Sequence, residues 1–404
     1  MNPPNKTFVP IELLSFANVR QLEVLEKVNE MGGILPAANA LGLCRGTVQE
    51  MVRNVRRKAS IQGVSPEHGM THAVPDTHIA KGVSTYYNKE GKVSAQWVKS
   101  TLKDGAMEEM IRSMVEVMTE DVRGKSPDIR TPAIVNADLM VVYPMGDPHF
   151  GLYAWGKETG DDFDLNIAER LLHASIDNLV ASAPPAETGL LLNLGDFFHM
   201  DNQSNLTKSG HQLDADSRWS KVMQVGLGAM IYAVTKLLEK HKRVIVRNVK
   251  GNHDGHSSFA LSLGMDAYFS NNDRVFVDLS PAEFWFHRFG LVLIGSTHGD
   301  QCKKEALPGV MACDRAEDWG VTRFRYFFVG HVHHDEIKEF PGVTVESFRT
   351  LAAKDAWHAG KGYRSGRDMR CIILHKQYGE IGRYRCDISM ITEASNQSTM
   401  AQAA

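Results

Sequence analysis

The chain has 404 residues, of which 43% are hydrophobic and 23% charged, and its net charge is −3. This length can hold two or three domains with full cores, and the balanced charge gives no overall attraction to nucleic acid or membranes. The 5 cysteines form no C-x-x-C pair, which argues against a disulfide framework or a zinc knuckle. No signal segment or bilayer-spanning apolar run is evident, so we expect a cytoplasmic protein without a membrane partner.

Residues 1–62 are predicted to form a small all-α domain. Apolar residues at helical spacing predict a helix, a short second helix and, after a turn at Gly42, a third helix. This order resembles the helix-turn-helix DNA-binding unit. The third helix carries Val48 and Val52 on its apolar face and basic and polar residues opposite, and a solvated bundle is the alternative reading. We expect DNA contacts from Arg45, Thr47, Gln49 and Arg53.

Residues 63–135 are predicted to be a linker that carries a hairpin over 83–98 and an amphipathic helix over 107–122. Gly124 to Pro132 then breaks the pattern, and no chemistry is apparent in this piece. The small, polar residues 392–404 are expected to be disordered.

From residue 136 to 391 the pattern changes to strands that alternate with loops and helices. Every candidate functional residue follows a predicted strand, where loops converge over a rigid sheet in open α/β folds. The strands are expected over 139–143, 190–194, 244–249, 291–294 and 327–329, and the helices over 167–180 and 222–241.

Five short segments after these strands carry histidine, aspartate or asparagine. A shared aspartate is the simplest way to hold two cations about 3.5–4 Å apart, and mixed nitrogen and oxygen ligands without thiolate suit Mn, Fe, Zn or Ni better than Ca or Mg. A single residue such as His298 is more often an ordinary core or surface histidine, but that reading does not explain the ordered set. The segments are Asp147-Pro148-His149, Gly195-Asp196-Phe197-Phe198-His199, Gly251-Asn252-His253-Asp254, His298-Gly299-Asp300 and Gly330-His331-Val332-His333.

Together these segments resemble the motifs of the calcineurin-like metallophosphoesterase superfamily, in order and over about residues 136–390. The resemblance implies an α/β fold, a four-layer αββα sandwich, and two divalent metal ions, with Mn favoured and Fe, Zn or Ni as alternatives. It also implies that water held between the metals attacks phosphorus, with His253 as general acid and Asp254 orienting it. The implied metal ligands are Asp147, His149, Asp196, Asn252, His298, His331 and His333, with Asp196 shared by both ions.

The segment over residues 195–199 indicates which branch of the superfamily the chain resembles. It lacks the arginine that follows the shared aspartate in protein phosphatases of the superfamily, and it is similar to the corresponding block of SbcD-type DNA repair exonucleases. That similarity implies that His199 positions the substrate. A helix-turn-helix joined to such a domain is similar to bacteriophage proteins described as DNA repair exonucleases.

We therefore expect a metal-dependent DNA nuclease with DNA as its partner. A nucleotide or cyclic-nucleotide phosphoesterase, and a DNA-binding regulator with a vestigial catalytic domain, are the alternatives. A homodimer is left open.

Overall fold

The computed structural model describes residues 8–68, 70, 73–74, 78–88, 93–102, 123–201 and 213–391. Contacts within the chain divide it into two units, Met1–Met110 and Ile111–Ala404, which are considered separately. The amphipathic helix expected over 107–122 and the tail 392–404 lie outside the described residues.

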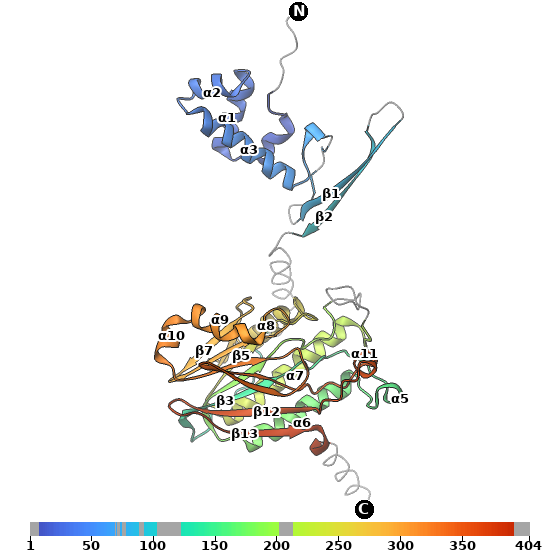
Figure 1. Cartoon of the computed structure of the whole chain (residues 1–404), viewed down its shortest axis with the longest axis vertical. Coiled ribbons are helices and arrows are strands. Elements are labelled where there is room, and N and C mark those ends of the chain that lie inside the picture. The colour runs from blue at the N-terminus through green and yellow to red at the C-terminus, as the bar shows by residue number, and fades with distance from the viewer. Residues whose placement is uncertain are drawn as a thin grey trace, which may run out of the picture. The chain divides into compact units, whose positions relative to one another are not determined.

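The first unit contains the three expected helices (Figure 1). Valines and leucines on α1 and α3 pack with alanines of α2 in one apolar core. The Asn18 side chain caps α1 by accepting from the backbone N–H of Gln21. The elements are the 3-10 helices η1 (Ile11–Phe16) and η2 (Pro66–His68), the helices α1 (Val19–Glu30), α2 (Ile34–Ala40) and α3 (Arg45–Ile61), and the strands β1 (His78–Tyr87) and β2 (Val93–Leu102).

The N-terminus of α3 is capped by an unusual residue. The Cys44 sulfur accepts from the backbone N–H of Thr47 at 3.4 Å and lies 2.9 Å from its hydroxyl. Arg45, Gln49 and Arg53 are exposed on α3, whereas the Thr47 hydroxyl is already paired. The predicted hairpin is present, because β1 and β2 pair in antiparallel fashion.

The second unit contains two sheets. The six-stranded sheet has the order β13-β12-β3-β4-β5-β6, and the five-stranded sheet has the order β10-β11-β9-β8-β7. β3 to β6 pair in parallel, as do β8, β9 and β11. The strands are β3 (Asn136–Met145), β4 (Ala186–Asn193), β5 (Arg243–Asn248), β6 (Val275–Asp278), β7 (Trp285–Phe289), β8 (Val292–Thr297), β9 (Phe324–Val329), β10 (Glu336–Phe340), β11 (Val343–Ser347), β12 (Asp368–His375) and β13 (Gly379–Asp387).

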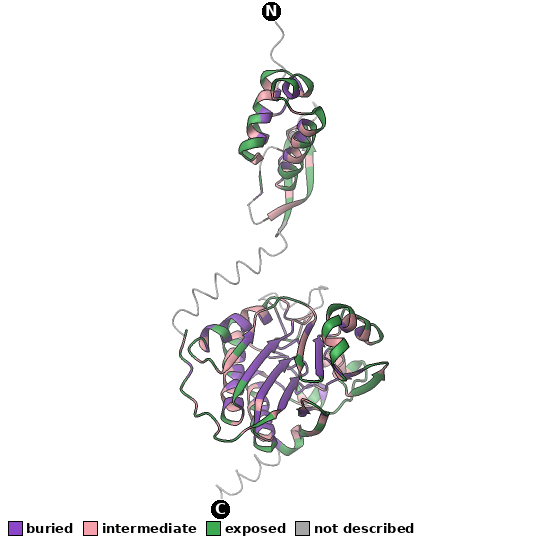
Figure 2. Ribbon diagram, turned by 90° about the vertical axis from the view of Figure 1, so that its left-hand side faces the viewer, coloured by how far each residue is buried: buried purple, intermediate pink, exposed green. Residues whose placement is uncertain are grey.

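Helices cover the outer faces of the sheets. In Figure 2 the central strands of the second unit are buried, and helices lie beside them. The helices are α5 (Gly156–Thr159), α6 (Leu165–Ser182), α7 (Trp219–Lys240), α8 (Ser257–Tyr268), the 3-10 turn η3 (Lys304–Ala306), α9 (Leu307–Asp314), α10 (Ala316–Val321) and α11 (Ala356–Gly360).

Three apolar clusters show how the layers pack. The inner cluster joins Met140 and Leu192 of the six-stranded sheet to Ile294 and Phe328 of the five-stranded sheet. A second cluster packs α6, α7 and α8 on the outer face of the larger sheet, and a third packs α9 on the smaller one. The predicted four-layer αββα sandwich is therefore confirmed by the packing.

Two details differ from the sequence-based expectation. The segment from Gly124, expected to be a linker, is tied to α8, because the Gly124 and Ser126 amides donate to the Ala267 and Tyr268 carbonyls at 3.0 and 3.2 Å. Helix α7 is also long and apolar enough, by length and composition alone, to span a bilayer, although no such run was expected. Its apolar residues belong to the outer core cluster, which is where a core helix of a sandwich places them.

Candidate metal centre

The seven predicted metal ligands come together at one edge of the two sheets. Parallel strands end at the same edge, so the loops that follow β3, β4, β5, β8 and β9 meet there. Six of the seven ligands fall into two groups of three, and within each group the ligand atoms lie within 4.8 Å of one another. The first group is Asp147, His149 and His333, and the second is Asp196, His298 and His331.

The spacing of the first group fits one bound cation. The Nε2 atoms of His149 and His333 are 3.2 Å apart, and His333 Nε2 is 3.6 Å from Asp147 Oδ1. Ligands bound at about 2.0–2.2 Å from a metal lie about 3–3.6 Å from each other at tetrahedral or octahedral angles. These side chains could therefore hold an ion without large movement.

The second group includes the asparagine as well. His298 Nε2 lies 3.2 Å from Asp196 Oδ2 and 3.0 Å from Asn252 Oδ1. His298 Nδ1 donates to the carbonyl of Leu194 at 2.9 Å, which leaves the Nε2 lone pair directed at the site. The Asp196 Oδ1 atom accepts from the backbone N–H of His253 at 2.8 Å. Sharing of Asp196 by two ions stays a prediction.

The backbone is strained at most of these ligands. Among the described residues, six non-glycine residues have a left-handed φ. Five of them are predicted ligands, namely Asp147 (47°), His149 (47°), Asp196 (50°), His331 (67°) and His333 (54°), and the sixth, Ser217 (69°), lies outside the site. Each such conformation costs about 1–3 kcal/mol and persists only where surrounding structure enforces it. The Asp147 carboxylate helps to hold the backbone at His331, because its two oxygens accept from the His331 amide at 2.9 and 3.0 Å.

Glycines in the motifs allow the loops to approach closely. A Cβ atom added at Gly251 would lie 2.0 Å from Asp196 Oδ1, and one at Gly330 would lie 2.9 Å from Asp147 Oδ2. At Gly195, whose φ is +98°, an added Cβ would lie 2.6 Å from His298 Nδ1. The glycines of these segments are thus required by the close packing of the ligand loops.

Neighbouring groups polarise the site. Burial opposes ionisation of Asp196, but the imidazoles of His298 and His253 outweigh it and hold the pKa of this carboxyl well below its usual value. Burial also disfavours a charged His298, yet Asp196 and Asp147 raise its pKa to about 10. Burial, together with the neighbouring imidazoles, holds the pKa of His149 well below its usual value. A cation and a proton therefore compete for the lone pair of His298.

His199 is buried against two other imidazoles rather than directed at solvent. Its side chain is 1% exposed, its Nδ1 lies 3.2 Å from His149 Nδ1, and its ring stacks on that of His253 at 5.3 Å. Burial lowers the pKa of His199 to about 3, so its ring is neutral. His199 also lines the hollow that opens over the site, and its substrate-positioning role stays a prediction.

Asp254 has a different role from the one expected. Its carboxylate accepts from the amides of Gly251, Asp196 and Phe198 at 2.9, 3.2 and 3.2 Å, so it ties two ligand loops together. The His253 imidazole is oriented instead by Nδ1, which lies 2.9 Å from the His199 carbonyl oxygen. The prediction that Asp254 orients His253 is corrected on this point.

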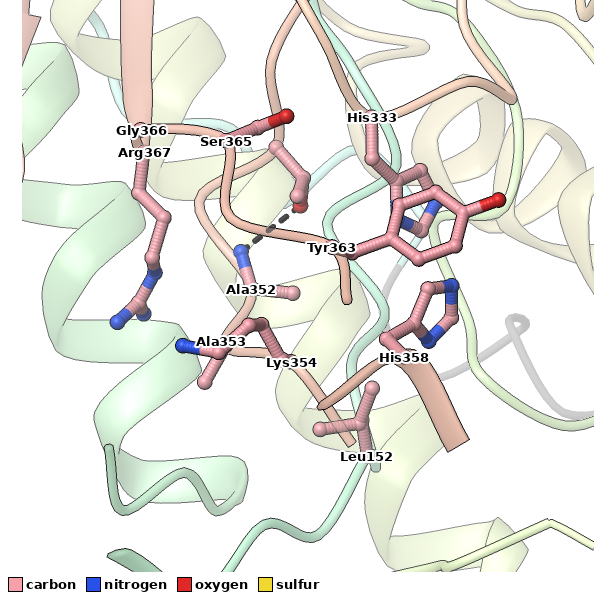
Figure 3. Close-up of a pocket in the computed structure, with 11 residues that line it drawn as sticks. Leu152, His333, Ala352, Ala353, Lys354, His358, Tyr363, Ser365, Gly366 and Arg367 are labelled. Atoms are coloured by element: carbon pink, nitrogen blue, oxygen red, sulfur yellow. Dashed lines mark hydrogen bonds between the residues drawn. The ribbon is translucent and has the colours of Figure 1, made fainter. Parts of the chain in front are cut away.

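Residues of the α11 segment were missed by the sequence analysis. The His358 ring stacks on that of His333, with centroids 5.2 Å apart, and His358 Nδ1 lies 2.7 Å from Asp355 Oδ1. Figure 3 shows His333, His358 and Tyr363 side by side at a small pocket next to the metal centre. The Asp-x-x-His spacing at a helix start was the only sequence signal available, and it is common at helix N-termini.

A larger hollow of about 520 Å³ opens over the metal centre. Its walls include His149, Asp196, Asn252, His253 and His331, which come from the predicted site. Its lining also includes residues that follow β11, namely Asp355, Trp357, His358 and Tyr363. This volume lies within the range of small-molecule sites, which is about 300–1,000 Å³.

Comparisons with known proteins add little to this picture. No family model and no curated protein sequence matches the chain. Among solved structures, an archaeal phosphodiesterase is 14% identical with a TM-score of 0.31, covering 61% of this chain and 99% of that one.

Two further structures show the same degree of likeness. A dimetal phosphatase from Danio rerio is 8% identical with a TM-score of 0.34, covering 61% of this chain and 98% of that one. A conserved uncharacterized protein from Streptococcus pneumoniae, described as a predicted phosphoesterase, is 11% identical with a TM-score of 0.26, covering 62% and 99%. Identities and TM-scores this low carry no argument about the site. The assignment of the fold therefore depends on the strand order and the packing of the layers, and that of the site on the geometry of its residues.

Proposed function

We propose that the second unit is a metal-dependent phosphoesterase that hydrolyses phosphodiester bonds with two divalent ions. The observation that carries this proposal is the pair of ligand groups, Asp147–His149–His333 and Asp196–His298–His331, with Asn252 beside the second and members of both groups lining one hollow. Two such ions neutralise phosphate oxygens and lower the pKa of a bound water. The nitrogen and oxygen ligands suit Mn, Fe, Zn or Ni, and of these we propose Mn, with the other three as alternatives.

We propose that His253 supplies the proton that the leaving oxygen needs. A carbonyl oxygen can only accept, so the 2.9 Å contact with the His199 carbonyl fixes the proton on His253 Nδ1. The other nitrogen, Nε2, is then the atom that donates to the substrate when the ring is protonated. Because the ring lines the hollow, it can reach a phosphoester held there.

For the substrate we propose DNA. The support is the first unit, where Arg45, Gln49 and Arg53 are exposed on α3 of a helix-turn-helix-like arrangement. Contacts of arginine with phosphate make binding strongly salt-dependent. The size of the hollow supports the second candidate, a nucleotide or cyclic-nucleotide phosphodiesterase, because one nucleotide fits a volume of this class.

One experiment separates these candidates. The full chain is incubated with Mn²⁺ and single-stranded, double-stranded or nicked DNA, in parallel with a chromogenic phosphodiester and cyclic nucleotides. Cleavage of DNA supports the nuclease, and hydrolysis of small diesters alone favours the nucleotide enzyme. DNA binding without any hydrolysis would favour a regulator with a vestigial domain and overturn the proposed activity.

A matched pair of variants links the activity to this site. His298→Asn removes a predicted ligand, and His375→Asn changes a histidine of the β12–β13 hairpin that the metal centre does not include. Loss of bound Mn²⁺ and of hydrolysis is expected in the first variant only. Equal activity in both would place the chemistry elsewhere.

A further inference from the structure

Part of the lining of the hollow over the metal centre is aromatic and exposed. Trp357 on α11 is 58% exposed and Tyr363 is 42% exposed, although both are large rings that soluble proteins usually cover. Both line the hollow that contains the metal centre. Exposed aromatic rings beside a reaction centre indicate a binding surface rather than a core.

The aromatic rings form a continuous row that begins at a predicted metal ligand. The His358 ring stacks on His333 at 5.2 Å with an interplanar angle of 22°. Trp357 and Tyr363 contact His358 edge to face, with centroid distances of 4.9 and 5.2 Å. The His358 ring therefore connects the two outer rings to the ring of the predicted metal ligand His333.

Hydrogen bonds hold His358, the ring that both outer rings contact. Asp355 caps α11, since its Oδ1 accepts from the His358 amide at 2.7 Å and also pairs with His358 Nδ1 at 2.7 Å. The carboxylate is buried, whereas the two outer rings remain accessible. A surface held in place in this way loses little conformational entropy when a ligand binds.

We propose that Trp357 and Tyr363 form a stacking surface for a nucleobase attached to the scissile phosphate. The inference rests on the proposed phosphoesterase function and specifies its substrate as a nucleotide or nucleic acid strand. The base stacks on an outer face, because centroids 6.0 Å apart leave no space between the two rings. Lys361, whose Nζ lies 6.0 Å from the Trp357 ring centroid, adds positive charge for a neighbouring phosphate.

The test compares two substrates with the same leaving group. Thymidine 5′-(4-nitrophenyl phosphate) carries a base, and ethyl 4-nitrophenyl phosphate does not. In Trp357→Ala, KM for the thymidine ester should rise about 5- to 150-fold, the range expected for loss of one stacked base, with kcat nearly unchanged. KM for the ethyl ester should stay the same, and Trp357→Phe should retain most of the affinity.

Tyr378→Ala is the matched control, because Tyr378 is 64% exposed on the β12–β13 turn and outside the hollow. It should leave both KM values unchanged. Equal changes for the two esters in Trp357→Ala, or no change, would overturn the stacking proposal. If the unmodified chain hydrolyses neither ester, the phosphoesterase proposal fails. Calorimetric binding of thymidine 5′-monophosphate to the Mn²⁺-containing protein then still tests stacking, and equal binding by Trp357→Ala would refute it.

Discussion

Gly251→Ala should disrupt the metal centre through a single methyl group. The added Cβ would lie 2.0 Å from Asp196 Oδ1 and 2.4 Å from the Asp196 amide nitrogen. Carbon and oxygen normally stay more than about 3 Å apart, so the two loops must separate by about 1 Å, and a misplacement of that size can cost about 10²-fold in turnover. Gly251 does not have a positive φ, so the effect is steric rather than conformational.

The assay measures bound Mn²⁺, the melting temperature and hydrolysis of a chromogenic phosphodiester. We expect Gly251→Ala to lose metal and to be destabilised by about 1–3 kcal/mol, the usual cost of overpacking. Gly255→Ala lies in the same loop, but its nearest neighbours would be 3.8 and 3.9 Å from the new Cβ, so it should behave like the unmodified chain. Normal metal content and stability in Gly251→Ala would refute the idea that close loop packing shapes the site.

Three further predictions concern other parts of the chain. His253→Ala should keep its metal content but lose about 10²–10⁴-fold in turnover of esters with poor leaving groups, and loss of metal instead would contradict its assignment as proton donor. Deletion of residues 1–62 should weaken DNA association at moderate salt while small-diester hydrolysis persists, and equal loss of both would show that these residues are structural. Burial lowers the pKa of His241 to about 3. Below about pH 6.5 the unfolded chain therefore binds a proton at this residue that the folded chain does not. The free energy of unfolding then decreases by about 1.4 kcal/mol for each unit by which the pH is lowered. Between about pH 6.5 and pH 5, urea unfolding should therefore show about 1.6 kcal/mol less loss of stability in His241→Gln than in the unmodified chain. An equal loss of stability in the two proteins would refute this origin.

The strands and the ligands that follow them were predictable because both signals are local. An apolar run that ends in Asp147 or Asp196 indicates a buried strand and a residue at its carboxyl end, whatever the rest of the chain does. The roles of Asp254 and His358 were not predictable, because they depend on contacts between loops that are far apart in sequence. Asp254 adjoins His253 in the chain, yet its carboxylate is engaged by amides that include Phe198, 56 residues away.

The seven-ligand arrangement depends on the packing of the two sheets against each other. In the first group Asp147 and His149 follow β3 of the six-stranded sheet, whereas His333 follows β9 of the five-stranded sheet. The second group is divided in the same way, with Asp196 from one sheet and His298 and His331 from the other.

Neither sheet alone therefore holds a complete group. The inner apolar cluster, which includes Leu192, Ile294 and Phe328, sets the separation of the sheets and with it the separation of the ligands. Since packed interiors transmit even a change of one methylene, core substitutions in this layer should alter metal affinity without any contact to the ligands.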